Sequence, residues 1–295
     1  MRILLMRTVL RILAWWSLRA LHVLGSVLGK ALWLFPNRLR TVTEINLALC
    51  YPDKSAEWRR EMGRASLIET GKLFCELGPL WRWPLERLDG LVVECSGWEY
   101  VEQALQEKRG LMVLLPHAGC WELWGLYVSQ RMPITFMYRP SREPAVDPLL
   151  HEMRSRAGAK MVPTNRQGVR AMYKALSAGQ AIGLLPDQEP RYGAGIFAPF
   201  FGMQAYTMVL PSRLAHKTSA AVVISCMERL PDGRGYHLHL LPLDATIYDE
   251  DPVVSASAAN RGVEEIIALN PAQYIWSYKR FRRKPEGQTR GYRRS

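Results

Sequence analysis

A histidine and a glutamate five residues apart are the side chains in this sequence whose types and spacing best suit acid–base chemistry. They are His117 and Glu122, in the stretch 110–122 with sequence GLMVLLPHAGCWE. An imidazole whose second ring nitrogen is held by a carboxylate can act as a general base. No G-x-S-x-G nucleophile elbow occurs in the chain, so we expect the base to deprotonate a hydroxyl on a bound substrate. H-x4-E alone is more often a structural histidine at the end of a strand.

The elements around this pair explain how the two side chains could meet. Residues 111–115 are an unbroken apolar run typical of a buried strand, and Pro116 cannot continue its hydrogen bonding. Residues 121–130 have apolar positions at helical spacing, so a helix is predicted to begin near Trp121. With His117 before that helix and Glu122 in its first turn, the two converge, and the helix dipole keeps the glutamate ionised. We therefore expect Glu122 to orient His117.

Polar residues follow two further predicted strands. Asp187 and Glu189 come directly after the apolar run 181–185, and Arg139 follows the run 133–138. Strands that alternate with helices predict a sheet with parallel members and a site at their carboxyl ends, which places these residues near His117. The two carboxylates could orient a histidine, position an arginine or bind a metal, or simply satisfy the amides of a turn. In a second possible pairing, Asp187 or Glu189 orients His117 while Glu122 braces the loop.

A group of basic residues follows Arg139 along the chain. Guanidinium groups suit bidentate contacts with phosphates and carboxylates. Arg139 and Arg156 are therefore candidate substrate-binding residues, and Arg139 together with backbone amides near His117 could stabilise an oxyanion. For most members of the group a solvated basic face is the simpler interpretation; they are Arg142, Arg154, Arg156, Lys160, Arg166 and Arg170.

The sequence HAGCWE resembles the H-x4-D/E signature of the late acyltransferases of lipid A biosynthesis, the lauroyl/myristoyl family. The likeness continues, in the family's order, through RTVTEINLALCYPD (40–53), MYRPSREPAVDPLL (137–150), LLPDQEPRYGAGIFAPFFG (184–202) and QYIWSYKRFRRKPEG (273–287). It implies transfer of a fatty acyl chain from an acyl carrier protein thioester to a hydroxyl of a lipid A precursor, with His117 and Glu122 catalytic and Asp187 supporting. An acyltransferase for another glycolipid, a thioesterase and a non-catalytic lipid-binding protein are the alternatives.

Cofactor and metal motifs are absent from the sequence. There is no G-x-G-x-x-G fingerprint and no P-loop, and the five cysteines contain no C-x-x-C pair. The odd number of cysteines indicates free thiols in a reducing compartment, and Cys120 is interpreted as a small apolar filler. His237 and His239 point the same way from one strand, but no third ligand lies at a usual spacing, so a structural role is favoured over zinc. We expect neither a cofactor nor a metal.

Basic charge is concentrated at the two ends of the chain, whose formal net charge is +12. Residues 1–40 hold seven basic residues and no acid, and the tail 279–295 has a net charge of +7. The N-terminal segment combines apolar runs, tryptophans and arginines, and Arg19 interrupts its longest apolar window, so a helix in the headgroup plane fits better than a full span. Spanning and plain burial against the domain stay open. Anionic inner-membrane lipids and an acidic carrier protein explain both basic ends, whereas nucleic acid explains only the tail.

These patterns together predict an α/β protein with a mixed, largely parallel sheet flanked by helices and an N-terminal membrane-associating helix. Residues 1–36 would form that helix, and residues 37–295 an acyltransferase domain ending in the basic tail. Strands are predicted at 91–95, 111–115, 133–138, 181–185 and 220–225, with one nearer the edge at 237–241, and a long helix at 55–80. The stretch GAGIFAPFFG is predicted to be a flexible loop of an acyl pocket, or plain core. The expected location is the cytoplasmic face of the cell inner membrane.

Overall fold

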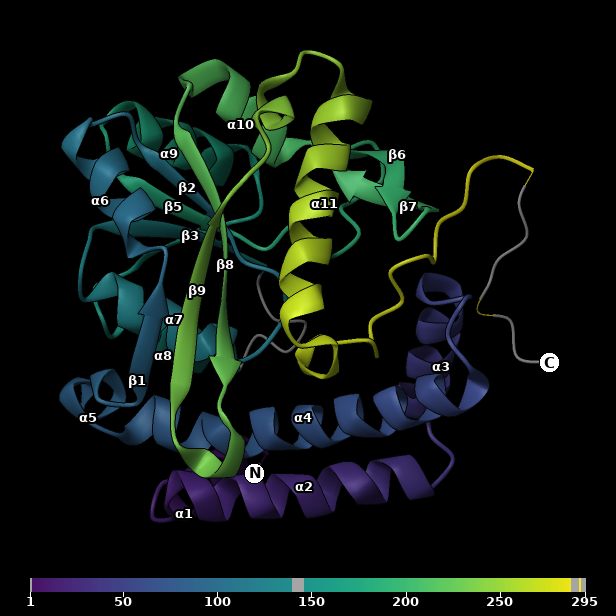
Figure 1. The fold of residues 1–295 in the computed structure, drawn as a ribbon. Helices are drawn as coiled ribbons and strands as arrows, with labels where there is room; N and C mark the ends of the chain where they lie inside the picture. The colour runs from purple at the N-terminus through teal and green to yellow at the C-terminus, as the bar shows by residue number, and fades with distance from the viewer. Residues whose placement is uncertain (1, 140–145, 288–291, 293–295) are drawn as a thin grey trace.

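A computed structural model describes residues 2–139, 146–287 and 292. Within them, seven strands form one sheet in the order β1-β9-β8-β2-β5-β3-β4, and β6 and β7 form a separate hairpin (Figure 1). The strands are β1 (Val92–Ser96), β2 (Leu111–Leu114), β3 (Ile134–Tyr138), β4 (Lys160–Pro163), β5 (Ala181–Leu184), β6 (Gly195–Phe200), β7 (Met203–Met208), β8 (Ala221–Arg229) and β9 (Tyr236–Pro242). The α-helices are α1 (Arg2–Leu13), α2 (Leu18–Leu34), α3 (Arg38–Cys50), α4 (Ala56–Arg82), α5 (Leu85–Asp89), α6 (Trp98–Gln106), α7 (Trp121–Ser129), α8 (Asp147–Ser155), α9 (Arg166–Ser177), α10 (Leu210–Thr218) and α11 (Pro252–Leu269).

The sheet is largely parallel, as predicted. The run β8-β2-β5-β3-β4 is parallel throughout, whereas β9 lies antiparallel to β8 and β1 pairs parallel to β9. All four residues of β2 and of β5 are buried, which explains their unbroken apolar sequences. Because β2, β5 and β3 are parallel neighbours, the residues that follow them emerge at one edge of the sheet.

Helices cover both faces of the sheet, and the side chains of each strand alternate between two cores. Leu111 and Val113 pack on the face that carries α6, α7 and α8. Met112 and Leu114 pack on the opposite face, against α9, α10 and α11. The site therefore rests on a sheet that is fixed from both sides.

The N-terminal helices pack along α4 at the lower edge of the molecule (Figure 1). Contact between α2 and α4 is backbone to backbone, because a Cβ on Gly71 would meet the carbonyl oxygen of Gly25 at 2.1 Å and one on Gly29 would meet Cα of Ile68 at 2.3 Å. A buried hydrogen bond of 2.8 Å between His22 and Glu76 also joins the two helices. One face of the predicted membrane-associating segment is thus part of the protein's own core.

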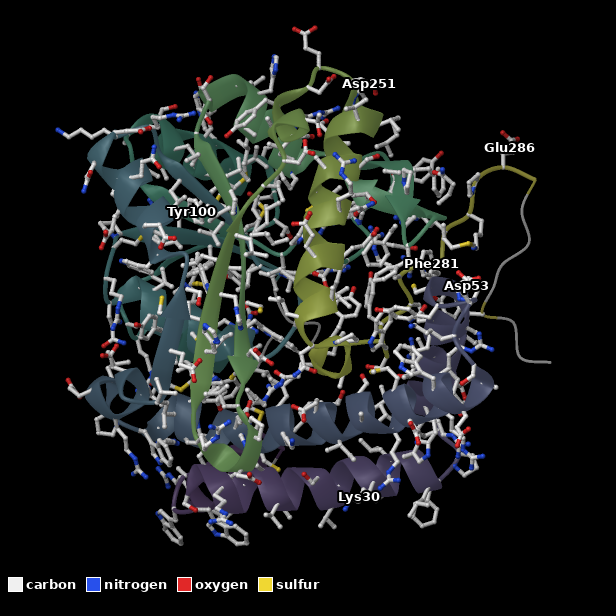
Figure 2. The ribbon with its side chains drawn as sticks, in the orientation of Figure 1. Lys30, Asp53, Tyr100, Asp251, Phe281 and Glu286 are labelled. Atoms are coloured by element: carbon white, nitrogen blue, oxygen red, sulfur yellow. The ribbon has the colours of Figure 1, made fainter. Side chains whose placement is uncertain are left out.

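The other face of these helices is apolar and exposed. Val23 and Val27 on α2 are 62% and 58% exposed, and Trp15, between α1 and α2, is 82% exposed. Side chains of both helices extend from the lower edge of the molecule (Figure 2). No single helix in the described residues has the length and apolar character needed to cross a membrane; α2 and α3, bent by 80° at the break between them, meet that requirement only as a pair and only by length and composition.

The segment 1–36, predicted as one helix, is two helices in the structure, α1 and α2, with a break at residues 14–17. The remaining elements match the sequence except at the hairpin β6-β7 and at β4. The long helix is Ala56–Arg82, and the Ser55 side chain accepts a hydrogen bond from the Trp58 amide as its N-cap. The stretch predicted as a flexible loop, GAGIFAPFFG, instead contains β6, which pairs with β7 in an antiparallel hairpin. Strand β4 was not predicted, because its sequence KMVP contains a lysine and a proline.

Candidate active site

The loop that carries His117 is pinned to two other segments. The Gly119 amide donates to the Gln273 carbonyl at 3.0 Å, and the Cys120 amide donates to the Met227 carbonyl at 2.7 Å. Gly119 has φ +63°, and a Cβ there would meet the Met227 carbonyl oxygen at 2.0 Å, so only glycine fits. These two amides, which are among the backbone amides near His117 considered for an oxyanion, are therefore already donated within the protein. Main-chain hydrogen bonds thus hold the loop to both neighbouring segments.

Asp187 holds both the ring and the backbone of His117. Its Oδ1 lies 2.9 Å from Nδ1 of His117, and its Oδ2 accepts the His117 amide at 3.0 Å. The contact arises because β5, which Asp187 follows, pairs directly with β2, which precedes His117. With Nδ1–H donating to the carboxylate, the lone pair of Nε2 faces outward as a general base requires.

The charge state of this pair follows from its burial. Burial would raise the pKa of Asp187, but the charge and hydrogen bonds of His117 outweigh it and hold that pKa below its usual value. Burial, with the Asp187 charge beside it, raises the pKa of Tyr274 well above its usual value, so the phenol stays neutral. An ionised carboxylate thus stands behind an imidazole whose side chain is 16% exposed.

Gln188 contacts the outward nitrogen of His117. Its side-chain nitrogen lies 3.2 Å from Nε2, in the position that a substrate hydroxyl would take. The Trp121 ring meets the imidazole edge-on with the centroids 5.0 Å apart. Sequence reasoning missed Gln188, although it lies between Asp187 and Glu189.

Glu122 does not hold His117 as expected. Both of its carboxylate oxygens instead accept hydrogen bonds from Arg154, at 3.2 and 3.1 Å from Nε and 2.5 Å from Nη2. Glu122 lies in the first turn of α7 and Arg154 in the last turn of α8, so the pair fastens two helices together. The structure therefore corrects the preferred pairing and matches the second one, in which Asp187 orients the histidine and Glu122 braces its surroundings.

The other predicted site residues lie in three different settings. Glu189 accepts the Arg283 amide at 2.8 Å and Arg282 Nε at 3.2 Å, so it fastens the C-terminal segment beside the loop. Arg156 donates to the carbonyls at the end of α4, and burial lowers its pKa; it is not placed beside His117 by any described contact. Arg139 is exposed at the end of β3, on the same edge of the sheet as His117.

Part of the basic C-terminal tail is buried rather than solvated. Arg280 is 2% exposed and donates to the Tyr206 carbonyl and the Thr207 hydroxyl, each at 2.8 Å. Arg283 donates to the Pro190 carbonyl at 2.5 Å. The tail was predicted to be a basic surface, but these arginines stabilise the site's own framework.

A buried ion pair supports the loop from behind. Arg229, the last residue of β8, donates to both oxygens of Glu76 at 2.6 and 2.8 Å and to the Gly119 carbonyl at 2.9 Å. Burial opposes ionisation of Glu76, yet Arg229 and His22 lower its pKa to about 2. Sequence reasoning missed this pair, although Glu76 stands out as a charge inside the apolar stretch LFCELGPLW of α4.

Cys120 and the larger hollow at the far ends of the strands add no second candidate for the chemistry in the described part of the chain. Burial raises the pKa of the Cys120 thiol, which suits the predicted apolar filler rather than a nucleophile. An open hollow of about 350 Å³ lies at the opposite ends of β3 and β4, lined in part by Thr135, Lys160 and Arg170. Because His117 follows the carboxyl end of β2, this hollow lies at the other edge of the sheet.

Comparison with known proteins assigns this arrangement to a family. Residues 2–283 match the family described as bacterial lipid A biosynthesis acyltransferase. The chain is 31% identical over 268 residues to the lipid A biosynthesis lauroyltransferase of Escherichia coli (strain K12), covering 90% of this chain and 87% of that protein. It is 28% identical over 270 residues to the lipid A biosynthesis palmitoleoyltransferase of the same strain, covering 91% and 87%. A phosphatidylinositol mannoside acyltransferase of Mycobacterium tuberculosis (strain ATCC 25618 / H37Rv) is 26% identical over 185 residues, which cover 61% of this chain and 57% of that protein. The chain therefore belongs to the bacterial lipid A biosynthesis acyltransferase family and is an acyltransferase.

Proposed function

We propose that this protein transfers a fatty acyl chain from an acyl carrier protein thioester to a hydroxyl of a lipid A precursor. The observation that carries the proposal is the His117–Asp187 pair at the carboxyl ends of β2 and β5, in a chain that matches this family over residues 2–283. A histidine oriented by a buried carboxylate activates a hydroxyl, and acceptors of this class supply one.

In the proposed reaction, the acceptor hydroxyl binds at Nε2 of His117 and gives up its proton as its oxygen attacks the thioester carbonyl. Asp187 stabilises the imidazolium that forms. The tetrahedral intermediate then collapses, the carbon–sulfur bond breaks, and the imidazolium returns the proton to the leaving thiolate. The products are the new ester and the free carrier thiol. A positioned base of this kind contributes about 10² to 10⁴ in rate.

Neighbouring residues have supporting roles in this proposal. Gln188, whose side-chain nitrogen is 3.2 Å from Nε2, occupies the hydroxyl position until the acceptor displaces it. The Glu122–Arg154 pair keeps α7 aligned behind His117. Arg139 is exposed at the same edge of the sheet. In this proposal its guanidinium group contacts a phosphate of the acceptor or the oxyanion.

We also propose that the exposed apolar face of α1 and α2 rests on the cytoplasmic face of the anionic inner membrane. Arg7, Arg11, Arg19 and Lys30 on these segments are exposed beside the apolar side chains. Apolar burial at the interface and attraction to anionic lipids would act together. Such a surface would bring the lipid acceptor to the sheet edge that carries His117.

The function is tested by incubating the purified chain with acyl carrier protein thioester and lipid A precursor and measuring the products by mass spectrometry. A precursor heavier by one acyl chain supports the proposal. Free fatty acid released at the same rate without acceptor would indicate a thioesterase, and no turnover of either kind would indicate a lipid-binding protein. Phosphatidylinositol mannoside is the comparison acceptor, because the mycobacterial relative matches 61% of this chain.

The membrane surface is tested by flotation with vesicles of phosphatidylethanolamine and phosphatidylglycerol. Val23→Asp with Val27→Asp should reduce the bound fraction strongly, because both side chains lie on the exposed face of α2. Val169→Asp with Val253→Asp is the matched control, since these valines are exposed on α9 and α11. Equal flotation of both variants would contradict this use of α2.

A further inference from the structure

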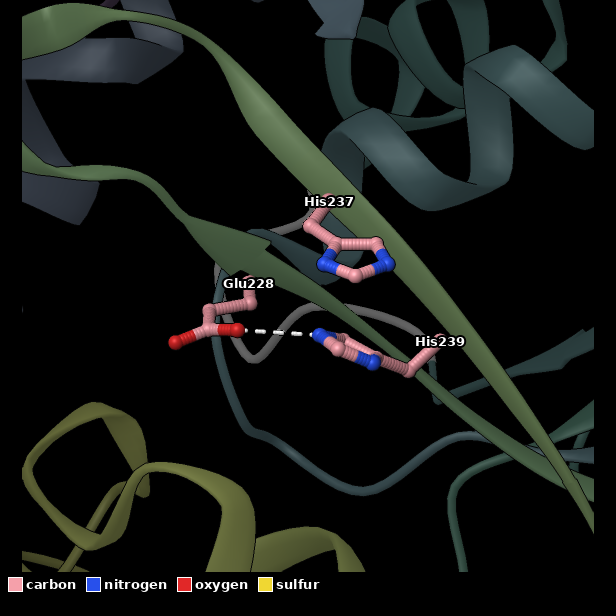
Figure 3. A group of neighbouring side chains, drawn as sticks. All are labelled: Glu228, His237 and His239. Atoms are coloured by element: carbon pink, nitrogen blue, oxygen red, sulfur yellow. Dashed lines mark hydrogen bonds and ion pairs between the residues drawn. The ribbon is translucent and has the colours of Figure 1, made fainter. Parts of the chain in front are cut away.

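Two histidines and a glutamate converge on one face of the sheet, away from His117. His237 and His239 lie two residues apart on β9, and Glu228 of β8 is the register partner of His237. One ligand atom from each side chain lies within 4.8 Å of the others, and all three residues are partly exposed. Figure 3 shows the two imidazole rings one above the other with the Glu228 carboxylate beside them. The third ligand that the sequence did not reveal comes from the neighbouring strand.

The surrounding contacts orient the three side chains. Ser96 lies 2.8 Å from Nε2 of His237, so Nδ1 is the nitrogen left to face the cluster. Nε2 of His239 lies 2.9 Å from Oε2 of Glu228, and Asn270 donates to the other oxygen at 2.9 Å. Partners that hold the second nitrogen of a ligand histidine and the second oxygen of a ligand carboxylate are typical of metal sites.

The spacing of the two rings also suits a shared cation. The ring centroids of His237 and His239 are 3.8 Å apart, and one ligand atom of each lies within 4.8 Å of the other and of Glu228. The Glu94 carboxylate, 3.3 Å from Nδ1 of His237 and 54% exposed, is within reach as a further oxygen ligand.

We propose that Glu228, His237 and His239 bind a divalent transition-metal ion, with zinc the best fit. Two imidazoles and one carboxylate are a common zinc set, and Glu94 or water would complete four-coordinate geometry. Ligand atoms about 2.0–2.1 Å from zinc stand about 3.4 Å apart, so side-chain movements on the order of 1 Å would close the cluster. On binding, the Glu228–His239 hydrogen bond is replaced by one bond from each residue to the metal.

The position of Glu228 in the chain gives the site a structural role. Its two neighbours support the catalytic loop, because the Met227 carbonyl accepts the Cys120 amide at 2.7 Å and the Arg229 side chain reaches the Gly119 carbonyl at 2.9 Å. A metal that ties Glu228 to β9 would fix the end of β8 between these two contacts. The ion would stabilise the support of His117 without contacting the substrate.

The proposal is tested on the full chain, stripped with a chelator and titrated with Zn²⁺ by calorimetry against a competing chelator. We expect one ion per chain and a rise in Tm with zinc concentration, since a ligand that binds only the folded state stabilises it. His239→Gln and Glu228→Gln should each lower zinc affinity by about 100-fold or more, because losing even a residue that only supports a ligand costs about 10–100-fold. His216→Ala, on α10, and Cys95→Ser, on β1, should leave affinity unchanged.

A measurement on the unaltered protein keeps the test decisive if a variant unfolds. Co²⁺ in the proposed site should give the visible absorption of a four-coordinate nitrogen and oxygen set without thiolate charge transfer. The metal-free variants should also unfold at a Tm close to that of the metal-free wild type. Zinc binding equal in wild type and His239→Gln, a thiolate band with Co²⁺, or no binding by the wild type at 10-fold molar excess would overturn the proposal.

Discussion

Two histidine–carboxylate pairs in this protein have nearly the same geometry but different surroundings. His117 and Asp187 are 2.9 Å apart at the sheet edge, and His22 and Glu76 are 2.8 Å apart behind the loop. Both carboxylates are buried. Glu76, however, is also held through both oxygens by Arg229. The length of the hydrogen bond and the burial of the acid therefore do not distinguish a catalytic pair from a structural one.

The difference lies in whether the carboxylate charge is already neutralised and whether a ring nitrogen is open to a substrate. In the Glu76 cluster the arginine cancels the carboxylate charge, and His22 is 6% exposed. At the sheet edge, none of the described hydrogen bonds joins an arginine to Asp187, and Nε2 of His117 meets only the displaceable amide of Gln188 among them. A catalytic pair needs a charge that is not cancelled and a nitrogen that a substrate can reach.

The largest effect should come from removing the catalytic ring. His117→Ala is expected to lower kcat by about 10² to 10⁴, the range for loss of a positioned general base, in a chain that still folds although the buried Asp187 carboxylate loses its ring partner. His22→Ala should show the reverse, with a loss of stability on the order of 1–3 kcal/mol and near-normal kcat per folded molecule. For both variants, acyl-transfer kinetics give kcat and chemical denaturation gives the free energy of unfolding. Near wild-type turnover of His117→Ala would contradict the assigned mechanism.

Breaking the buried ion pair should have the largest effect on stability. Arg229→Met leaves the Glu76 charge buried, so we expect a loss of about 3–5 kcal/mol in the free energy of unfolding. Adding Glu76→Gln to this variant removes the uncompensated charge and should recover part of that loss. Urea denaturation of the single and the double variant measures their free energies of unfolding. If the double variant is no more stable than Arg229→Met, the buried charge is not the cause.

Acid should weaken the Glu76 cluster over a defined range. Because the pKa of Glu76 is lowered to about 2 from 4.5, its contribution is fully present above pH 4.5 and is lost as the pH falls toward 2. At about 1.4 kcal/mol per pKa unit, the loss reaches about 3 kcal/mol by pH 2. Unfolding free energies of wild type and Glu76→Gln, measured from pH 6 to the lowest pH at which wild type folds, should converge on acidification. A difference that does not change with pH would contradict the low pKa.

The smallest effects on kcat are expected for substitutions of Asp187 and Glu122, the two carboxylates near His117, and their sizes should differ. Asp187→Asn keeps the shape but loses the charge that favours the productive ring orientation and stabilises the imidazolium, so we expect a fall in kcat of about 10²-fold. Glu122→Gln weakens only the brace to Arg154 and should cost less than 10-fold, with KM near that of wild type. Steady-state kinetics across pH distinguishes them, since Asp187→Asn should also move the acidic limb of the profile. A larger effect from Glu122→Gln would reverse the assignment.

The sequence was sufficient to predict the scaffold and most of the positions around the site. Apolar runs predicted β2 and β5, because each is buried on both faces, and the residues after them met at one edge as the parallel arrangement requires. The mixed and largely parallel sheet was confirmed in the same way. The hairpin β6-β7 was not, because its glycines and prolines are typical of loops.

The partners of the charged residues could not be predicted, because they depend on contacts between distant segments. Glu122 was assigned to His117 from local spacing, but Arg154 lies 32 residues away and reaches it only when α8 packs beside α7. Arg156 was assigned to substrate, but it binds the carbonyls at the end of α4. Glu228 is close to His237 along the chain, but their pairing became visible only through the antiparallel register of β8 with β9.

Because glycines bring the backbones of α2 and α4 into contact, the first two helices cannot be removed without disturbing the rest of the fold. A fragment that begins at residue 37 would uncover the bare main chain around Gly71 and take His22 away from Glu76. Shortening the chain to improve its solubility would thus loosen the framework behind the loop as well. Polar replacements on the outer side of α2 are the safer route to a crystallisable enzyme.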